Sequence, residues 1–320
     1  MNNEKIKNQI QTQEAIIRTI AFFDMFDYPL TAWEAWKYCD IPSPRLDAIE
    51  PPLSRAGRTG SGEGTGVRAE GGFYFLPGRE KIVETRKKRY NYSLRKLKRA
   101  RLIAKVFKII PWIKMIAVGN IIGSYNLKDE SDIDLFIITE KNRIWLSRFG
   151  CVLITKILNL RPTPKNSRDK ICLSFFVSEE KLNLKDLMLD EKDPYFVYWL
   201  AGLYPIYNAN NTWTKFYEAN SWLKNYLPNW QVGKFNNQFN AGKPWPKFYR
   251  LVIGLIFGWT EKLIKIFQLK VLAPELKSLM NKDTRVVIND QILKLHVLDR
   301  REHYRDLYYN KLNEILKQNN

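Results

Sequence analysis

Cysteine and histidine are scarce in this chain of 320 residues, which contains three of the first and two of the second. Cys39, Cys151 and Cys172 are odd in number and far apart, so they suggest neither a disulfide framework nor a set of metal ligands. His296 and His303 have no cysteine or second histidine at ligand spacing, which argues against a zinc site, and we expect His296 to be structural. The three thiols fit a reducing compartment and predict a cytoplasmic protein.

Long hydrophobic runs are also absent. The longest, Leu251 to Trp259, is about half of what a bilayer span needs, and the polar N-terminus lacks the apolar core of a signal peptide. We therefore expect no membrane span. The basic and aromatic segment 243–247 would suit a membrane interface, but a buried core helix over 248–272 is the favoured interpretation.

Acidic residues are few relative to basic ones, and the imbalance is local. The net charge is +19, yet residues 1–78 carry 8 basic and 10 acidic side chains, whereas residues 79–120 carry 14 basic and 2 acidic ones. A concentrated positive field attracts polyanions such as RNA, DNA or nucleotides. The alternative is a helix face that is simply solvated.

Residues 79–107 carry most of this charge and show helical periodicity in Val83, Leu94 and Leu97. No acid lies between Glu84 and Asp129, so pairing within the helix cannot neutralise the charge. We therefore predict a contact with a nucleic-acid backbone or an acidic partner. The candidate residues are Arg86, Lys87, Lys88, Arg89, Arg95, Lys98 and Arg99.

The N-terminal region, residues 1–78, predicts three short helices around 13–26, 31–38 and 45–53, followed by a glycine-rich stretch and a strand at 73–76. This order resembles a winged-helix domain. Such domains commonly bind DNA, but the slightly acidic charge favours a protein contact or a structural role here.

The middle of the chain has a mixed α/β pattern. Apolar runs at 112–118, 132–139 and 170–178 predict strands, and 142–160 predicts an amphipathic helix. From about residue 193 onward the pattern is helical and aromatic. The sequence therefore predicts an α/β (mixed α+β) fold with a mixed sheet and flanking helices. Its four regions are a winged-helix-like domain (1–78), a basic connecting helix (79–110), an α/β domain (111–200) and a helical C-terminal domain (201–320).

Two carboxylates carry the most specific chemical signal. Asp132 and Asp134 are separated by one residue at the start of a predicted strand, so their side chains project from the same face. Such a pair repels itself unless a cation lies between the carboxylates, and Mg²⁺ (or Mn²⁺) prefers oxygen ligands completed by substrate phosphates. A glycine-containing turn upstream, at Gly119, would let backbone amides approach those phosphates.

This arrangement resembles the polymerase-beta-like nucleotidyltransferase superfamily, over residues 111–200. Gly119-Asn120, eleven residues before Asp132-Ile133-Asp134, matches the spacing of the family motif. The resemblance implies transfer of a nucleoside monophosphate from a nucleoside triphosphate to a hydroxyl acceptor. It also implies that Asp132 and Asp134 are catalytic metal ligands. The candidate nucleotide-binding residues are Gly119, Asn120, Ser124, Lys128 and Arg143.

The chain departs from the family pattern on the strand at 170–178. A third carboxylate is usual there, but this strand has none, and Ser174 stands at about the expected position. Losing a general base costs roughly two to four orders of magnitude in rate. The alternative function is therefore a weak or inactive transferase fold that binds nucleic acid or a partner, and an interaction module of a toxin–antitoxin-like pair is a third.

Overall fold

The computed structural model describes residues 2–42, 67–119, 125–233, 235 and 238–318. The helix predicted around 45–53 and the predicted phosphate-binding residues Asn120 and Ser124 lie outside this part of the chain.

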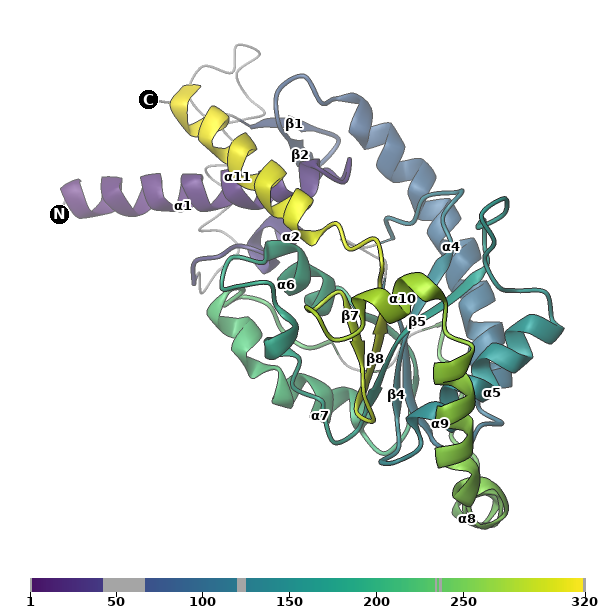
Figure 1. Cartoon of the computed structure of the whole chain (residues 1–320). Coiled ribbons are helices and arrows are strands. Elements are labelled where there is room, and N and C mark those ends of the chain that lie inside the picture. Colours follow the sequence, from purple (N-terminus) through teal and green to yellow (C-terminus); the bar gives the residue numbers. More distant parts are fainter. Residues whose placement is uncertain (1, 43–66, 120–124, 234, 236–237, 319–320) are drawn as a thin grey trace.

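A six-stranded mixed sheet organises the described part of the chain, with the order β6-β3-β4-β5-β8-β7 (Figure 1). Its centre is formed by β3 (Ile113–Val118), β4 (Ile133–Thr139) and β5 (Ile171–Ser178), as the apolar runs predict. Strands β4 and β5 are parallel, and the other neighbouring pairs are antiparallel. The mixed α/β fold class is therefore confirmed.

Three further strands come from the C-terminal third: β6 (Tyr204–Asn208), β7 (Val286–Ile288) and β8 (Ile292–Leu295). The sequence predicts a helical domain over residues 201–320 and does not anticipate these strands, which complete the sheet. Pro205 disfavours a strand in the sequence, but β6 lies at the sheet edge, where a missing backbone N–H is tolerated. Strands β7 and β8 are too short to show a periodicity of their own.

Each face of the sheet has its own hydrophobic core. On one face, Leu135 and Ile137 of β4 pack with side chains of α4 (Lys81–Phe107) and α5 (Ile144–Ile157). On the other, Phe136 and Ile138 pack with α6 (Pro194–Ala201), α7 (Thr212–Ala219) and the N-terminal helix α1 (Asn2–Asp24). The alternation along β4 places Asp134 on the same face as Phe136, toward α6.

The N-terminal region comprises α1, α2 (Ala32–Lys37) and a hairpin of β1 (Arg68–Glu70) with β2 (Phe73–Phe75). Helix α2 begins where the sequence predicts, because Thr31 and Glu34 form a reciprocal capping box. The buried ring of Phe22 stacks on Tyr198 of α6, with 4.1 Å between centroids. This region is therefore packed directly on the α/β part of the chain.

The remaining helices surround the lower and upper ends of the sheet in Figure 1. They are α8 (Lys247–Phe257), α9 (Glu261–Lys270), α10 (Pro274–Leu279) and α11 (Arg301–Gln318), with short 3-10 turns at Lys185–Leu187, Ser221–Asn225 and Gly258–Thr260. Within the described ranges, no helix combines the length and the apolar character required to cross a bilayer. The core helix predicted over 248–272 is wrong, because Phe248, Leu255 and Trp259 are exposed.

Candidate metal and nucleotide site

Asp132 and Asp134 converge at the beginning of β4, as their spacing predicts. A carboxylate oxygen of each and the sulfur of Cys172 all lie within 4.8 Å of one another. Cys172 enters this group because the parallel pairing of β4 with β5 places it opposite Asp134. The two carboxylates therefore lie close enough to share one cation.

The electrostatics of this pair favour a bound cation. Burial, together with the charge of Asp132, raises the pKa of Asp134 to about 7. Burial also raises the pKa of Asp132, which Lys96 and Arg161 partly oppose. The pKa of the Cys172 thiol lies well above its usual range, because it is buried beside two carboxylates. Cys172 is thus a protonated neighbour, and the oxygen ligands come from the aspartates.

Asp134 opens into a cavity of about 230 Å³. Gly119 lines the same side, where its backbone N–H donates to the Asp134 carbonyl oxygen at 2.9 Å. An aromatic wall faces them, in which Trp199 of α6 stacks on Phe175 and Phe196 with centroid separations of 5.4 and 5.7 Å. The cavity therefore combines an acidic end with flat apolar surfaces.

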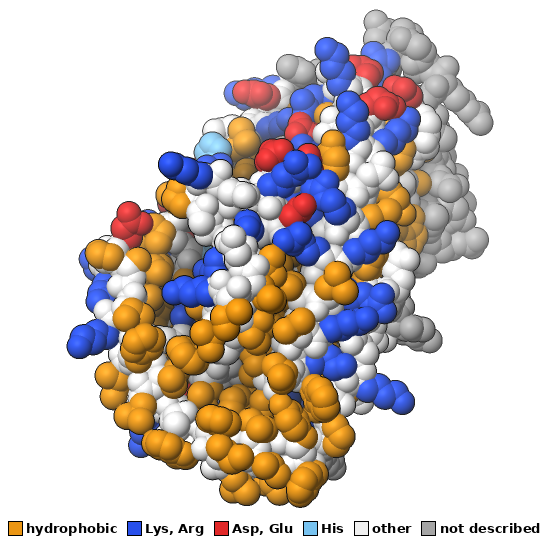
Figure 2. Space-filling view, turned by 90° about the vertical axis from the view of Figure 1, so that its right-hand side faces the viewer, with side chains coloured by type: hydrophobic (Ala, Val, Ile, Leu, Met, Phe, Trp, Pro, Cys, Tyr) orange, Lys and Arg blue, Asp and Glu red, His pale blue; other side chains and the backbone are white. Residues whose placement is uncertain are grey.

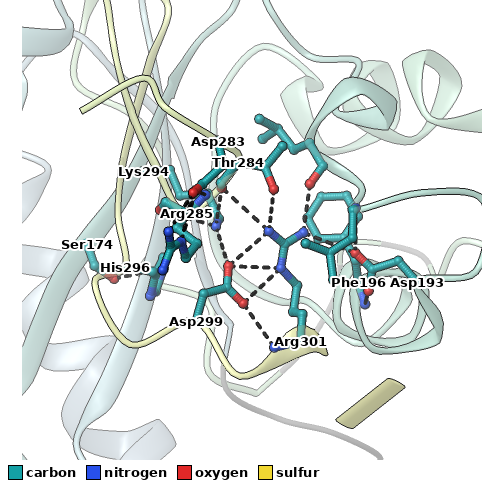
Figure 3. A network of polar contacts seen from close by, with 12 residues as sticks. Ser174, Asp193, Phe196, Asp283, Thr284, Arg285, Lys294, His296, Asp299 and Arg301 are labelled. Atoms are coloured by element: carbon teal, nitrogen blue, oxygen red, sulfur yellow. Dashed lines mark hydrogen bonds and ion pairs between the residues drawn. The ribbon is translucent and has the colours of Figure 1, made fainter. Parts of the chain in front are cut away.

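His296 lines the same cavity, although the sequence gives it only a structural role. Its Nε2 lies 3.3 Å from the hydroxyl of Ser174 (Figure 3). That hydroxyl accepts from the thiol of Cys172 at 3.4 Å. Burial, followed by the charge of Lys294, lowers the pKa of His296 to about 4, so the ring is neutral near pH 7. A chain of neighbouring polar side chains thus connects Asp134, through Cys172 and Ser174, to His296.

Arg301 fixes the far wall of the cavity (Figure 3). Only 3% exposed, it donates to Asp299 at 2.9 Å, to Asp193 at 3.1 Å and to the hydroxyl of Thr284 at 2.7 Å. Asp193 in turn caps α6 by accepting from the backbone N–H of Phe196. One guanidinium group therefore holds the start of α11 against the start of α6.

Lys96 lies behind the two aspartates and is missed by the sequence analysis. It is fully buried, and its Nζ donates to Asp169 at 2.8 Å and to the carbonyl oxygen of Ser131 at 2.5 Å. A lysine within a strongly basic helix is expected to face water. Only the tertiary contact with the loop before β4 distinguishes it from its neighbours.

Among the described residues predicted for nucleotide binding, Lys128 and Arg143 are not brought together with Asp134. Lys128 is exposed on the loop that precedes β4. Arg143 follows the opposite end of β4 and lines a different cavity, together with Glu140 and Arg250. Gly119 is the one described member of the predicted phosphate-binding turn that borders the acidic pair.

The predicted nucleic-acid contacts on α4 are largely paired within the chain. Arg86 binds Glu34, Arg89 binds Asp27, Arg95 binds Asp129 and Asp169, and Lys87 binds Glu84. Pairing within the helix is limited to Lys87 and Glu84, but acids far away in sequence pair with Arg86, Arg89 and Arg95, which the sequence does not predict. Arg99 is partly buried, whereas Lys88 and Lys98 point to solvent.

Comparisons with protein-family models, curated proteins and solved structures found no match to this chain. The assignment of a function therefore depends on the chemistry of the cavity.

Proposed function

We propose that this chain is a magnesium-dependent nucleotidyltransferase with a polymerase-beta-like domain. The observation that carries the proposal is the convergence of Asp132 and Asp134, of which Asp134 lines a cavity with aromatic walls. The substrate would be a nucleoside triphosphate, and the acceptor a hydroxyl group.

The residues present fit a hard divalent cation. Their ligand atoms are carboxylate oxygens, and the thiol beside them is held protonated. The raised pKa of Asp134 means that a cation would displace a proton when it binds near pH 7. Bound Mg²⁺ or Mn²⁺ would supply positive charge to the phosphate oxygens during transfer.

The chain's own groups would bind and orient the substrate. The backbone at Gly119 would border the phosphates, and Trp199 with its stacked neighbours would offer an apolar surface to a base or sugar. In the transfer, the acceptor oxygen forms a bond to the α-phosphorus, the bond to the bridging oxygen breaks, and pyrophosphate leaves. The hydroxyl proton passes to water, because no third carboxylate is found near the pair in the described part of the chain.

The first test measures metal binding and turnover separately. Mg²⁺ with a non-hydrolysable triphosphate should raise the melting temperature of the wild-type chain, and triphosphate with Mg²⁺ should release pyrophosphate. Asp134→Asn should abolish both effects, since it removes one ligand and one charge. Asp186→Asn, at an exposed position on a 3-10 turn, is the matched control and should change neither. Retention of the Mg²⁺ effect in Asp134→Asn would exclude the site.

A second candidate function is a transferase fold with little or no turnover that binds nucleic acid or a partner. It is favoured by Cys172, which stands opposite Asp134 on the strand where the family carries its third acid. Residues 1–78 would then act as a winged-helix-like contact domain, and the exposed Lys88 and Lys98 would be its neighbouring anion contacts. Such binding should weaken with salt and persist in Asp132→Asn.

Substitution at Cys172 distinguishes the two candidates. Cys172→Asp would place a third carboxylate within reach of the pair, and we expect it to raise pyrophosphate release by about 100-fold or more. Cys172→Ser is the matched control, since it changes the side chain without adding charge. A Cys172→Asp chain that binds Mg²⁺ and triphosphate but stays inactive would support the binding function.

A further inference from the structure

Helices α8 and α9 expose their apolar side chains at one end of the molecule. Phe248 is 76%, Leu255 74% and Trp259 71% exposed, and no residue from 248 to 257 is buried. We call this surface the α8–α9 apolar face. Its other members are Trp245, Leu251, Ile256, Phe257, Leu263, Ile266, Phe267 and Val271. Figure 2 shows hydrophobic side chains gathered over the lower end of the molecule, where Figure 1 places α8 and α9.

Polar residues of the two helices make specific contacts with the rest of the fold. In α8, Arg250 donates to Glu140 at 2.8 Å and Tyr249 donates to the carbonyl oxygen of Ile109 at 2.9 Å. In α9, Glu261 accepts from the backbone N–H groups at the start of α5, and Gln268 is buried against Trp145. An ordinary surface helix turns its apolar stripe to the core and polar residues to water. Here Ile253, Ile264 and Leu269 pack against the core, but a second set of apolar side chains on the same helices faces water.

The segment that forms this face is strongly basic, although Asp290 and Glu140 from elsewhere in the chain pair with Lys265 and Arg250. Between residues 243 and 272 the only acid is Glu261, and its oxygens bind the amides of Trp145 and Leu146 at 2.9 and 3.0 Å. Lys243, Lys262 and Lys270 are exposed along the same segment. Neighbouring exposed lysines are Lys105 at the end of α4 and Lys156 at the end of α5. The face is thus an apolar surface with cations and without an exposed acid in its own segment.

The combination of apolar and basic side chains limits the kinds of partner that could cover this face. Exposed apolar patches of this extent mark interaction sites in proteins. A second copy of the chain would bring one set of lysines against the same set, which costs free energy by repulsion. A bilayer with acidic headgroups offers apolar depth and negative charge together, and exposed tryptophans such as Trp245 and Trp259 are typical of that boundary.

We propose that the α8–α9 apolar face binds peripherally to membranes that contain acidic phospholipids. The apolar side chains enter the boundary between headgroups and acyl chains, and the surrounding lysines contact the headgroups. Neither helix has to cross the bilayer, so the proposal agrees with the absence of a spanning helix in the described ranges.

The test is co-flotation of the full chain with vesicles. Wild-type protein should float with phosphatidylcholine–phosphatidylglycerol vesicles, bind far less to phosphatidylcholine alone, and dissociate progressively as salt is added. The triple variant Phe248→Ser/Leu255→Ser/Trp259→Ser should lose at least about 100-fold in affinity, because three side chains no longer leave water. These positions are exposed, so folding should be retained, and circular dichroism checks it.

The matched control is Ile10→Ser/Trp33→Ser/Leu307→Ser, which changes three exposed apolar side chains on α1, α2 and α11. This control should bind vesicles like the wild type. Equal loss in both variants, or equal binding to neutral and acidic vesicles, would overturn the proposal. A concentration-dependent dimer in light scattering that the α8–α9 variant abolishes, without vesicle binding by the wild type, would assign the face to self-association instead. None of these measurements depends on nucleotide turnover.

Discussion

His296 is held neutral inside the cavity, and this has a measurable effect on stability. Burial lowers its pKa to about 4 from the ordinary 6.5. Between these values the unfolded chain binds a proton that the folded chain does not, so stability falls as the pH drops from about 6.5 to 4.

Replacing His296 should remove this pH dependence. We expect the free energy of unfolding of His296→Gln to decline less over that interval than that of the wild type, by on the order of 2 kcal/mol. Urea denaturation at a series of pH values measures it. His303→Gln, at the other histidine of the chain, is exposed on α11 and should follow the wild type. Parallel curves for all three proteins would contradict the buried neutral ring.

At the residue scale, the sequence indicates the acidic pair but not its surroundings. Asp132 and Asp134 could be predicted because their spacing and the apolar strand that follows are local features. Lys96 and His296 could not, since nothing near them in sequence distinguishes a buried charge or a cavity histidine from an ordinary one. Their roles depend on β5, β8 and the loop before β4, which meet them only in the folded chain.

At the scale of elements, Arg301 joins α11 to α6 through two carboxylates that are themselves buried. Arg301→Ala would leave Asp193 and Asp299 without their shared cation, and we expect a loss of about 3–5 kcal/mol in stability. Thermal denaturation measures it. Arg305→Ala, also on α11, removes ion pairs to more exposed acids and should cost less than about 1 kcal/mol. Similar losses of stability in the two variants would show that the ion pairs of Arg301 with Asp193 and Asp299 do not stabilise the fold more than surface ion pairs do.

The apolar periodicity of residues 248–272 predicts a core helix, but periodicity alone identifies an apolar stripe and does not fix which way a helix faces. For α4 and α5 the stripe faces the sheet, as is usual in globular proteins. For α8, the polar contacts of Tyr249 and Arg250 leave a set of apolar side chains facing water, and these contacts involve residues about 110 to 140 positions away.

In the molecule as a whole, the sheet joins segments that the hydrophobic pattern of the sequence assigns to separate domains. The predicted domain 111–200 contains β3, β4 and β5, but β6 and β8 flank them from beyond residue 200. Short edge strands carry little local signal, so this division could not be recognised from hydrophobic patterning. The class of fold could be predicted, and the extent of its sheet could not.

A fragment of residues 111–200 is therefore expected not to fold. It would expose the edges of β3 and β5 and lose the wall that carries His296. Amide proton NMR should give poorly dispersed signals for the fragment and well-dispersed signals for the full chain. A dispersed spectrum for the fragment would show that the outer strands are not needed for the core.

The acidic pair and the attachment point of α8 lie at opposite ends of strand β4. Asp134 lies near its beginning, and Glu140, which holds α8 through Arg250, follows its end. Six residues of extended chain span roughly 20 Å. A triphosphate approaching the aspartates would then be more than two Debye lengths, at about 8 Å each, from lipid bound at α8. If both proposals hold, an anionic bilayer at α8 would therefore have little electrostatic effect on a triphosphate at Asp134.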